Sequence, residues 1–270
     1  MSSIVTNISA SRAGQALGEA TRSIAQSTTQ LATGRRVNSA ADDTAGMAMG
    51  SKFSAQATSL QRAMRNANEG IAMLQTADSA ANGISDSLFR MKELAIQAAN
   101  GTYSDSDRSA LNIEFSQLRD HIGASINNTR WNDQNLLDGT RSTVNLQIGA
   151  ASGDTQAVDM GDFSNLSVLT SAGISNASDA IASLSAIDNS LTAVDASRVK
   201  WGAAINRLTH AGEVSSQVAL NLDESRSKII DADYAKATAD LAKAQILQMA
   251  GKAMLSQANQ EPIGVLRLLR

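Results

Sequence analysis

The sequence predicts a mainly α-helical protein: a long antiparallel helical bundle or coiled coil that carries a small β-hairpin and a pair of terminal helices. The 270 residues include a single proline, so the backbone is almost never forced out of a helix. Apolar residues make up 43% of the chain but aromatic residues only 3%, which leaves mostly small or unbranched apolar side chains that favour helices. In several segments these side chains recur at alternating steps of three and four residues, the pattern of a coiled-coil seam.

The first predicted element is a helix with one narrow apolar stripe near the N-terminus. Ala10, Leu17, Ile24 and Leu31 recur at steps of seven residues, and the residues around them are mostly polar. A single narrow stripe buries little apolar area, and helix nucleation is unfavourable. We therefore expect this helix to need a partner helix.

Two predicted helices follow, one with a long seam and one shorter. The shorter helix spans about residues 106–128, and the polar segment 104–107 offers capping oxygens and negative charge at its start. Its apolar face contains Leu111, Phe115, Leu118 and Ile122. The long seam has no break and consists of Leu74, Ala77, Ala81, Ile84, Leu88, Met91, Ala95 and Ala98.

The region of about residues 141–179 differs from the helical segments in its apolar pattern and its composition. The stretches VNLQIGA and TQAVDM alternate apolar and polar residues around the turn-rich ASGD, which predicts a β-hairpin. Sequence rich in Ser, Asn and Gly follows. The β content is therefore small, and this region leaves no room for a second large domain.

Heptad spacing resumes in a second long seam. A helix over about residues 180–225 would be on the order of 65 Å long at 1.5 Å per residue. Helices with matching stripes bury them against one another as an antiparallel bundle. Only Arg198, Gly212 and Ser215 interrupt the seam, whose other members are Leu184, Ile187, Leu191, Val194, Trp201, Ile205, Leu208, Ala219 and Leu222.

A second narrow stripe lies near the C-terminus and is the expected partner of the N-terminal one. We expect residues 1–40 and 230–270 to form a domain of paired terminal helices, poorly ordered in the monomer and folding together on assembly. Residues 41–229 would form a rod-like helical core domain that includes the hairpin region. The stripe runs through Ile230, Tyr234, Ala237, Leu241, Ala244, Leu247, Ala250, Met254 and Ala258. The apolar residues expected to drive polymerisation are Leu17, Ile24, Leu31, Leu241, Leu247, Met254 and Leu255.

Composition and motifs argue against several classes of function. The net charge of −3 provides no basic surface for nucleic acid. No cysteine is present for thiolate chemistry, and the two histidines lack partners at metal-binding spacing. Asp42 and Asp43 point in different directions as neighbours and are better explained as a solvated or capping turn than as an acid–base pair. The sequence therefore predicts no enzyme, no cofactor and no metal.

The sequence shows no signal for cleavage or membrane insertion. The N-terminal MSSIVTNISASRAG lacks the charged start, apolar run and cleavage site of a secretory signal, and no run approaches the ~20 apolar residues of a membrane span. If the protein leaves the cell, we expect a route that does not cut a signal peptide.

Several segments together resemble bacterial flagellin, the subunit of the flagellar filament. Residues 30–50 read QLATGRRVNSAADDTAGMAMG, and residues 242–270 read AKAQILQMAGKAMLSQANQEPIGVLRLLR. Residues 65–80, 90–108 and 127–139 carry the same resemblance. It covers roughly residues 1–150 and 180–270, in register at both ends.

The resemblance implies a structural subunit that polymerises into the filament used for motility. It implies that the terminal helices pair in an inner coiled coil lining the filament channel, and the short middle region implies a minimal form without large outer domains. It further implies export unfolded through the flagellar type III apparatus to an extracellular filament. The implied partners are other copies of the chain, an export chaperone, the filament cap and hook-junction proteins.

The resemblance also implies a contact for an innate immune receptor of animals. Arg90, Leu94 and Glu114 correspond to the flagellin region that toll-like receptor 5 recognises. Arg90 and Leu94 are four residues apart on one helix face, off the apolar seam, so both are expected to be exposed in the monomer. An ordinary contact between subunits would explain the same residues.

Two other functions compete with a filament subunit. A hook–filament junction protein shares flagellin-like ends, but the dense resemblance over residues 65–139 favours flagellin. A membrane-active amphipathic helix protein would fit the terminal stripes, yet these lack the Lys- and Arg-rich polar face expected of such helices.

Overall fold

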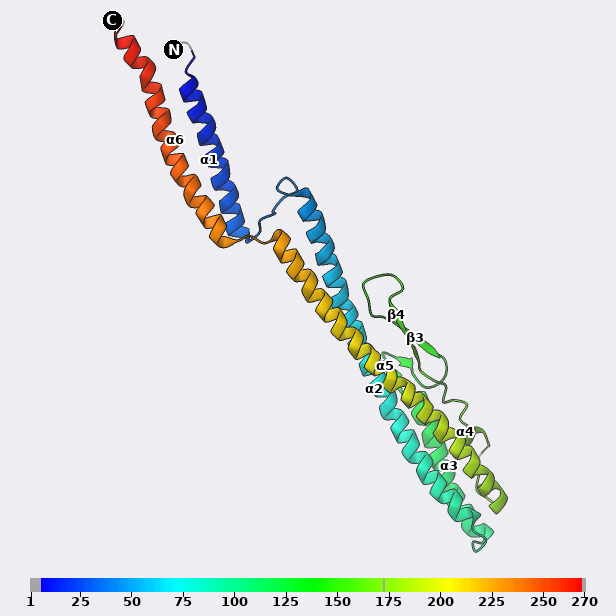
Figure 1. The fold of residues 1–270 in the computed structure, drawn as a ribbon. Coiled ribbons are helices and arrows are strands. Elements are labelled where there is room, and N and C mark those ends of the chain that lie inside the picture. The colour runs from blue at the N-terminus through cyan, green and yellow to red at the C-terminus, as the bar shows by residue number, and fades with distance from the viewer. Residues whose placement is uncertain (1–5, 172, 269–270) are drawn as a thin grey trace. The chain divides into compact units, whose positions relative to one another are not determined.

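A computed structural model describes the backbone of residues 6–171 and 173–268, and the side chains of these residues up to 260 except that of Ser171. The described residues form six α-helices and two small antiparallel sheets, which confirms the predicted mainly α-helical fold (Figure 1). In chain order the elements are α1 (Ile8–Thr33), α2 (Thr44–Ala99), α3 (Asp105–Asn128), β1 (Arg130–Trp131), β2 (Gln134–Asn135), β3 (Thr143–Gln147), β4 (Thr155–Asp159), α4 (Ser167–Ser171), α5 (Ala177–Ile230) and α6 (Tyr234–Leu268).

The chain divides into two compact units. One unit consists of Met1–Gln56 with Leu220–Arg270, and the other of Ala57–Ala219. Helices α2, with 56 residues, and α5, with 54, contribute to both units, because the boundaries at Gln56 and Leu220 lie within these helices. Both helices are longer than the seams at residues 74–98 and 184–222, and the sequence next to each seam contains no proline that would end the helix.

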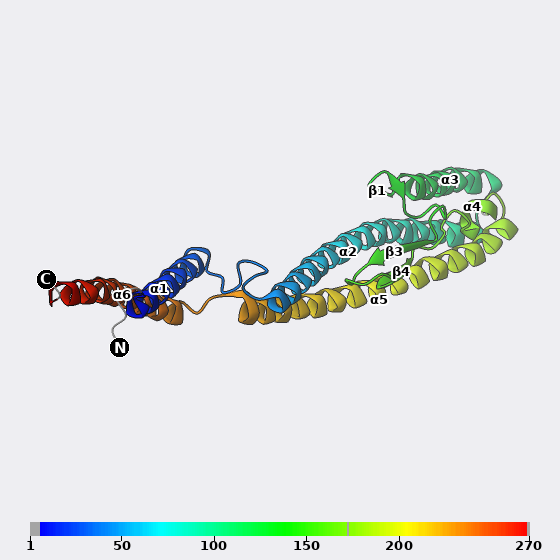
Figure 2. The same ribbon diagram turned by 90° about the horizontal axis from the view of Figure 1, so that it is seen from above.

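In the unit Ala57–Ala219, α2 and α5 lie side by side and run antiparallel (Figures 1 and 2). Lys92 Nζ lies 2.6 Å from Asp188 Oδ1, and Arg198 Nε lies 2.8 Å from Asp78 Oδ1. The ion pair with Asp78 explains how Arg198 can occupy a seam position. The predicted first seam is confirmed, since all eight of its members are buried: Leu74, Ala77, Ala81, Ile84, Leu88, Met91, Ala95 and Ala98.

Helix α3 packs on another side of α2. Its start has the predicted cap: the Ser104 side chain accepts from the amide of Asp107, and the Asp107 carboxylate accepts from the amide of Ser104. The Ser104 hydroxyl is the main reason that the pKa of Asp107 is lowered. Phe115 and Ile122 are fully buried on the face predicted to be apolar. The middle of α2 therefore lies between two helices.

The hairpin predicted in the middle region is confirmed as β3 and β4. The strands pair antiparallel, with Val144 opposite Val158. The hairpin is attached to the helices at both strands: Asn66 of α2 donates to the carbonyl of Gln147 at 3.0 Å, and the Trp201 indole of α5 donates to the carbonyl of Asp159 at 3.0 Å. It therefore belongs to the same core as the long helices. The two-residue strands β1 and β2 were not predicted from the sequence.

In the unit Met1–Gln56 with Leu220–Arg270, α1 and α6 form an antiparallel pair (Figure 1). Asn7 Nδ2 donates to the carbonyl of Ala258 at 2.7 Å near one end, and the Tyr234 hydroxyl donates to the carbonyl of Leu31 at 3.0 Å near the other. These contacts fix which residues of the two helices face each other.

Candidate assembly surfaces

The contact between α1 and α6 is built mainly from small side chains. Ala20 of α1 and Ala237, Ala244 and Ala258 of α6 are the buried apolar members, and alanines at a seam let two helices approach closely. The larger members are half-buried rather than buried, because two helices alone cannot enclose them. These half-buried residues are Leu17, Ile24, Leu31, Leu241 and Leu255, all expected from the sequence to drive polymerisation.

The predicted α6 seam is wrong at Leu247, Ala250 and Met254, whereas its last predicted member, Ala258, is buried. Leu247 and Met254 were expected to continue it, but they are 52% and 64% exposed. Regular heptad geometry continues from Ala244 in a step of four, to Gln248. Gln248 does face α1, where its Nε2 donates to the Thr21 hydroxyl at 3.4 Å. The seam then continues through Gly251, Leu255 and Ala258. The apolar spacing alone indicates Leu247, because the residue at the true seam position, Gln248, is polar.

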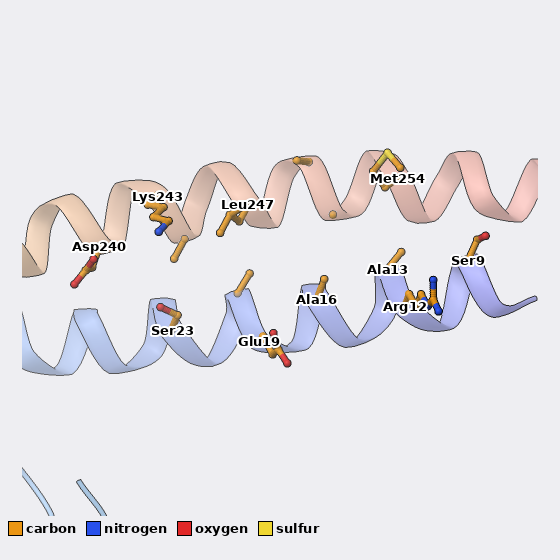
Figure 3. A pocket seen from close by; sticks show the side chains of 14 residues that line it. Ser9, Arg12, Ala13, Ala16, Glu19, Ser23, Asp240, Lys243, Leu247 and Met254 are labelled. Atoms are coloured by element: carbon orange, nitrogen blue, oxygen red, sulfur yellow. The ribbon is translucent and has the colours of Figure 1, made fainter. Parts of the chain in front are cut away.

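Leu247 and Met254 instead line a groove of about 710 Å³ that runs along α1 and α6 (Figure 3). Alanines from both helices contribute to its floor, and Figure 3 shows Ala13 and Ala16 of α1 on the side facing α6. The remaining lining residues are Ser9, Arg12, Glu19, Ala20, Ser23, Asp240, Lys243, Ala244, Ala250 and Gly251. The groove is thus mainly apolar, with charges of both signs among its lining residues.

A further apolar stripe of α6 lies away from α1. Ile246 and Met249 are each 62% exposed, and their helical positions lie roughly opposite the seam that contacts α1. Helix α6 therefore has apolar side chains on its seam, along the groove and on this outer side. Apolar side chains that are exposed on more than one side of a helix indicate further packing partners, and α1 covers only one side of α6.

The connector between α1 and α2 is held to the end of α5 within the same unit. The amide of Arg36 donates to the carbonyl of Ile230 at 2.6 Å, and its guanidinium donates to the carbonyl of Ile229. Gly34 has φ 68°, and this left-handed conformation ends α1. The Gly34 carbonyl also accepts a hydrogen bond from the amide of Ala232.

Asp42 and Asp43 have structural partners in this connector, as the capping-turn interpretation predicts. The Asp42 carboxylate accepts from the amides of Asn38 and Ser39 at 3.0 and 2.9 Å. The Asp43 carboxylate accepts from the amide of Gly46 at 2.8 Å, at the start of α2. Hydrogen bonds from these backbone amides lower the pKa of both carboxyl groups.

The structure corrects the expectation for Leu94. This residue is 2% exposed and belongs to the core, because α3 covers the side of α2 that the seam against α5 leaves open. Arg90 is exposed as expected, and its guanidinium bonds to Glu114 of α3 and to Glu93, each at 2.9 Å. The bond to Glu114 is the main reason that the pKa of Arg90 is raised. Arg90 and Glu114 therefore form one surface feature, and Leu94 does not belong to it.

Family models match both ends of the chain. The model of the bacterial flagellin N-terminal helical region matches residues 4–142, and that of the C-terminal helical region matches residues 184–269. The chain belongs to the bacterial flagellin family. The resemblance noted in the sequence is thereby confirmed, and so is the minimal size of this flagellin.

Other flagellins match this one over nearly its whole length. The flagellin of Halalkalibacterium halodurans is 41% identical over 244 residues, which cover 89% of this chain and 90% of the relative. The flagellin of Listeria monocytogenes is 33% identical over 274 residues, which cover 95% and 96%. Flagellins are structural subunits of the flagellar filament, so this chain is a structural component of the bacterial flagellum.

Solved structures give the same fold. Bacillus cereus flagellin superimposes with a TM-score of 0.52 at 31% identity, covering 56% of this chain and 88% of that one. A Vibrio parahaemolyticus protein, provisionally named as flagellar hook-associated, superimposes with a TM-score of 0.59 and covers 70% of this chain and 100% of that one. Its 20% identity shows a shared fold alone.

Two further findings concern membranes and metals. No described helix of this flagellin is both long and apolar enough to cross a bilayer. Over the described part of the chain, no group of three or more His, Asp or Glu residues is placed to hold a metal ion.

Proposed function

We propose that this flagellin polymerises with copies of itself by packing the exposed apolar sides of α6, together with the groove along α1 and α6, against terminal helices of neighbouring copies. The observation that carries the proposal is that α1 covers one side of α6 and leaves Leu247, Met254, Ile246 and Met249 exposed. At about 25 cal/mol per Å² of buried apolar surface, each such contact contributes modestly, and cooperation among many subunits sets filament stability.

In this proposal the predicted assembly residues have two separate roles. The half-buried Leu17, Ile24, Leu31, Leu241 and Leu255 hold α1 and α6 together within one subunit. Leu247 and Met254 contact a neighbouring copy. We assign residues 1–40 and 230–270 to the inner domain that lines the filament channel, and residues 41–229 to a rod-like core domain that includes the hairpin region at about 141–179.

We also propose that pairing of α1 and α6 is coupled to assembly. Two helices that share one narrow seam of buried alanines and half-buried larger residues gain little from each other, and helix nucleation is unfavourable. Neighbouring subunits would bury the remaining apolar sides of α6 and so stabilise both helices.

The test is assembly of the purified protein. Heat-dissociated monomers are mixed with salt or with short filament seeds and imaged by negative-stain electron microscopy. Long uniform filaments are the expected result. Monomers that persist at high concentration with seeds present would contradict self-sufficient polymerisation.

The same experiment separates the filament subunit from a hook–filament junction protein, which is the alternative. The fold shared with the Vibrio parahaemolyticus protein is compatible with either function. A junction protein would not elongate seeds and would occur in a few copies per flagellum, whereas a filament subunit occurs in thousands. Counting the chain in sheared flagella by quantitative mass spectrometry gives the second measurement.

We further propose that the subunit is exported unfolded through the flagellar type III apparatus to an extracellular filament. An export chaperone, the filament cap and hook-junction proteins would be its partners along this route. Support comes from family membership and from the marginal seam between α1 and α6, which is easily opened. In cells that lack the export ATPase, the protein should accumulate inside. Its appearance in the medium at an unchanged level would refute this route.

The exposed Arg90–Glu114 pair is our proposed contact for toll-like receptor 5 or for a neighbouring subunit. The pair joins α2 and α3 at an accessible surface. Replacing Arg90 by Ala should lower the response of a receptor reporter cell, or else weaken filaments, without unfolding the core. No change in either measurement would refute both roles.

A further inference from the structure

Among the described methionines of this flagellin, three are buried, Met64 is half-buried and the other four are exposed. The chain contains 9 methionines. Met73, Met91 and Met160 are buried in the unit Ala57–Ala219. Met249 and Met254 of α6 are 62% and 64% exposed, the highest values among the methionines named as exposed in the other unit.

The two exposed α6 methionines lie on the surfaces that carry the proposed assembly. Met254 lines the groove along α1 and α6 (Figure 3). Met249 lies five residues earlier, on the outer side of the helix beside Ile246, where both are exposed. Both thioethers are therefore open to a reagent in the monomer and would be covered by neighbouring copies in the filament.

From this placement we propose that Met249 and Met254 are oxidation sites through which peroxides block assembly of the subunit. The inference rests on the proposed polymerisation. A lone pair of Sδ attacks one oxygen of a peroxide, the O–O bond breaks, and that oxygen remains on sulfur as a sulfoxide. With hydrogen peroxide, the other oxygen leaves as water after proton transfer; sulfur loses two electrons and the peroxide gains them.

Oxidation changes what these two side chains can contact. A thioether is a flexible apolar group that packs well in irregular contacts, whereas a sulfoxide is polar and disrupts methionine-rich interfaces. The surrounding groove residues Ala13, Ala16, Leu247 and Ala250 offer apolar side chains. Ser9 and Arg12 also line the groove, but a sulfoxide pressed against its apolar side chains replaces an apolar contact with a polar one and should raise the critical concentration for assembly roughly tenfold.

The buried methionines of the other unit provide an internal standard. Oxidation follows accessibility, so Met91 and Met160 should react much more slowly than Met249 and Met254. Mild peroxide treatment should therefore stop assembly while the core remains folded. Methionine sulfoxide reductases reverse the modification, so the block should also be reversible.

The test begins with site-resolved mass spectrometry. Monomers and assembled filaments receive the same pulse of hydrogen peroxide, followed by excess free methionine as quencher, and are digested with trypsin. Cleavage after Lys243, Lys252 and Arg267 places Met249 and Met254 in separate peptides. We expect both to be oxidised at least about tenfold faster in monomers than in filaments, as access to sulfur decides the rate. Equal rates in the two states would overturn the proposal.

Assembly is then measured on a partly oxidised pool of monomers. Seeds are added, filaments are pelleted, and sulfoxide is measured at each site in pellet and supernatant. Both α6 sulfoxides should be enriched in the supernatant, and reductase treatment of that fraction should restore assembly. If untreated protein forms filaments, equal sulfoxide content in pellet and supernatant would overturn the proposal. Failure of the untreated protein to assemble would instead refute the proposed polymerisation.

Variants identify the responsible methionines. The double variant Met249→Leu, Met254→Leu should assemble equally well before and after peroxide treatment. The matched control is Met47→Leu with Met49→Leu, which alters two other exposed methionines and should remain peroxide-sensitive. If peroxide still blocks the α6 variant, or no longer blocks the control, the assignment to α6 is wrong. The pellet measurement on the wild-type chain decides the question if the α6 variant does not assemble.

Discussion

Gly251 of α6 faces Leu17 of α1, and a Cβ added to the glycine would lie 3.7 Å from Cβ of Leu17. This is an ordinary van der Waals distance, so the position can accept a methyl group. The glycine therefore weakens the seam without a steric need for it: it has high backbone entropy in the unfolded chain and no side chain to pack.

Gly251→Ala should stabilise the pair of α1 and α6 in the monomer. The expected gain is about 0.5–1 kcal/mol from helix propensity, with a small addition from contact with Leu17. Far-UV circular dichroism during thermal unfolding of the monomer gives the measurement.

Gly18→Ala is the matched control, because a Cβ at Gly18 would have no neighbour within 4 Å. It should gain helix propensity but no contact. A decrease in helix content for Gly251→Ala, with an increase for Gly18→Ala, would show that the helices lie closer together than described.

Leu247→Asp and Leu255→Asp should separate assembly from pairing of the terminal helices. Leu247 is exposed along the groove, so its replacement should block polymerisation and leave the helix content of the monomer unchanged. Leu255 is half-buried in the seam, and a carboxylate there should reduce both helix content and polymerisation. Seeded sedimentation and circular dichroism measure the two properties.

Gln245→Asp serves as the control for the added charge on α6, where Gln245 is exposed two residues before Leu247. It should weaken assembly less than Leu247→Asp. Normal filaments from Leu247→Asp, seen by electron microscopy, would rule out the groove as an assembly surface.

The long helices could be predicted because their apolar spacing and their packing agree. Every member of the seam from Leu74 to Ala98 is buried, and the stretches around ASGD pair as the hairpin. The sequence also predicted the cap at Ser104, because capping depends on residues close together in the chain. Local pattern was sufficient in these cases.

The burial of Leu94 and the seam position of Gln248 depend on which helices pack together, and the apolar spacing of one helix does not specify its packing partners. Leu94 lies off the seam that faces α5, and only the position of α3 explains its burial. Gln248 is polar and so does not stand out in an apolar pattern, yet heptad geometry places it against Thr21 of α1. In both cases the sequence shows the apolar stripe of one helix. It does not show how many other helices pack on that helix or on which sides they lie.

Arg108→Met should destabilise the unit Ala57–Ala219. Arg108 is buried, and its guanidinium donates to the carbonyls of Ala98 and Asn100 at 2.8 and 3.0 Å, which satisfies the C-terminal end of α2. Removing the donors deprives both carbonyls of their Arg108 hydrogen bonds and leaves that of Asn100 only the longer bond from the amide of Tyr103, at 3.4 Å, so the expected cost is about 1–3 kcal/mol. A unit of this size should then melt roughly 2–10 °C lower in calorimetry.

Arg207→Met is the control for that experiment, since Arg207 is exposed on α5. Its melting temperature should stay close to that of the wild-type chain. If Arg108→Met melts at the wild-type temperature, the carbonyls at the end of α2 must find other partners, and the guanidinium is not required for the cap.

The connector between α1 and α2 should loosen in acid. Hydrogen bonds from the amides of Ser39 and Asn38 lower the pKa of Asp42 below its ordinary 3.8. Because the folded pKa is the lower one, the stabilisation is fully present above pH 3.8 and is lost as the pH falls through the folded value. The amide signal of Ser39 in an NMR titration should therefore move with a midpoint below 3.8. Asp42→Asn should abolish that movement, while the amide of Gly46, which bonds to Asp43, still titrates. A Ser39 midpoint at or above 3.8 would show that the carboxylate does not hold the turn in solution.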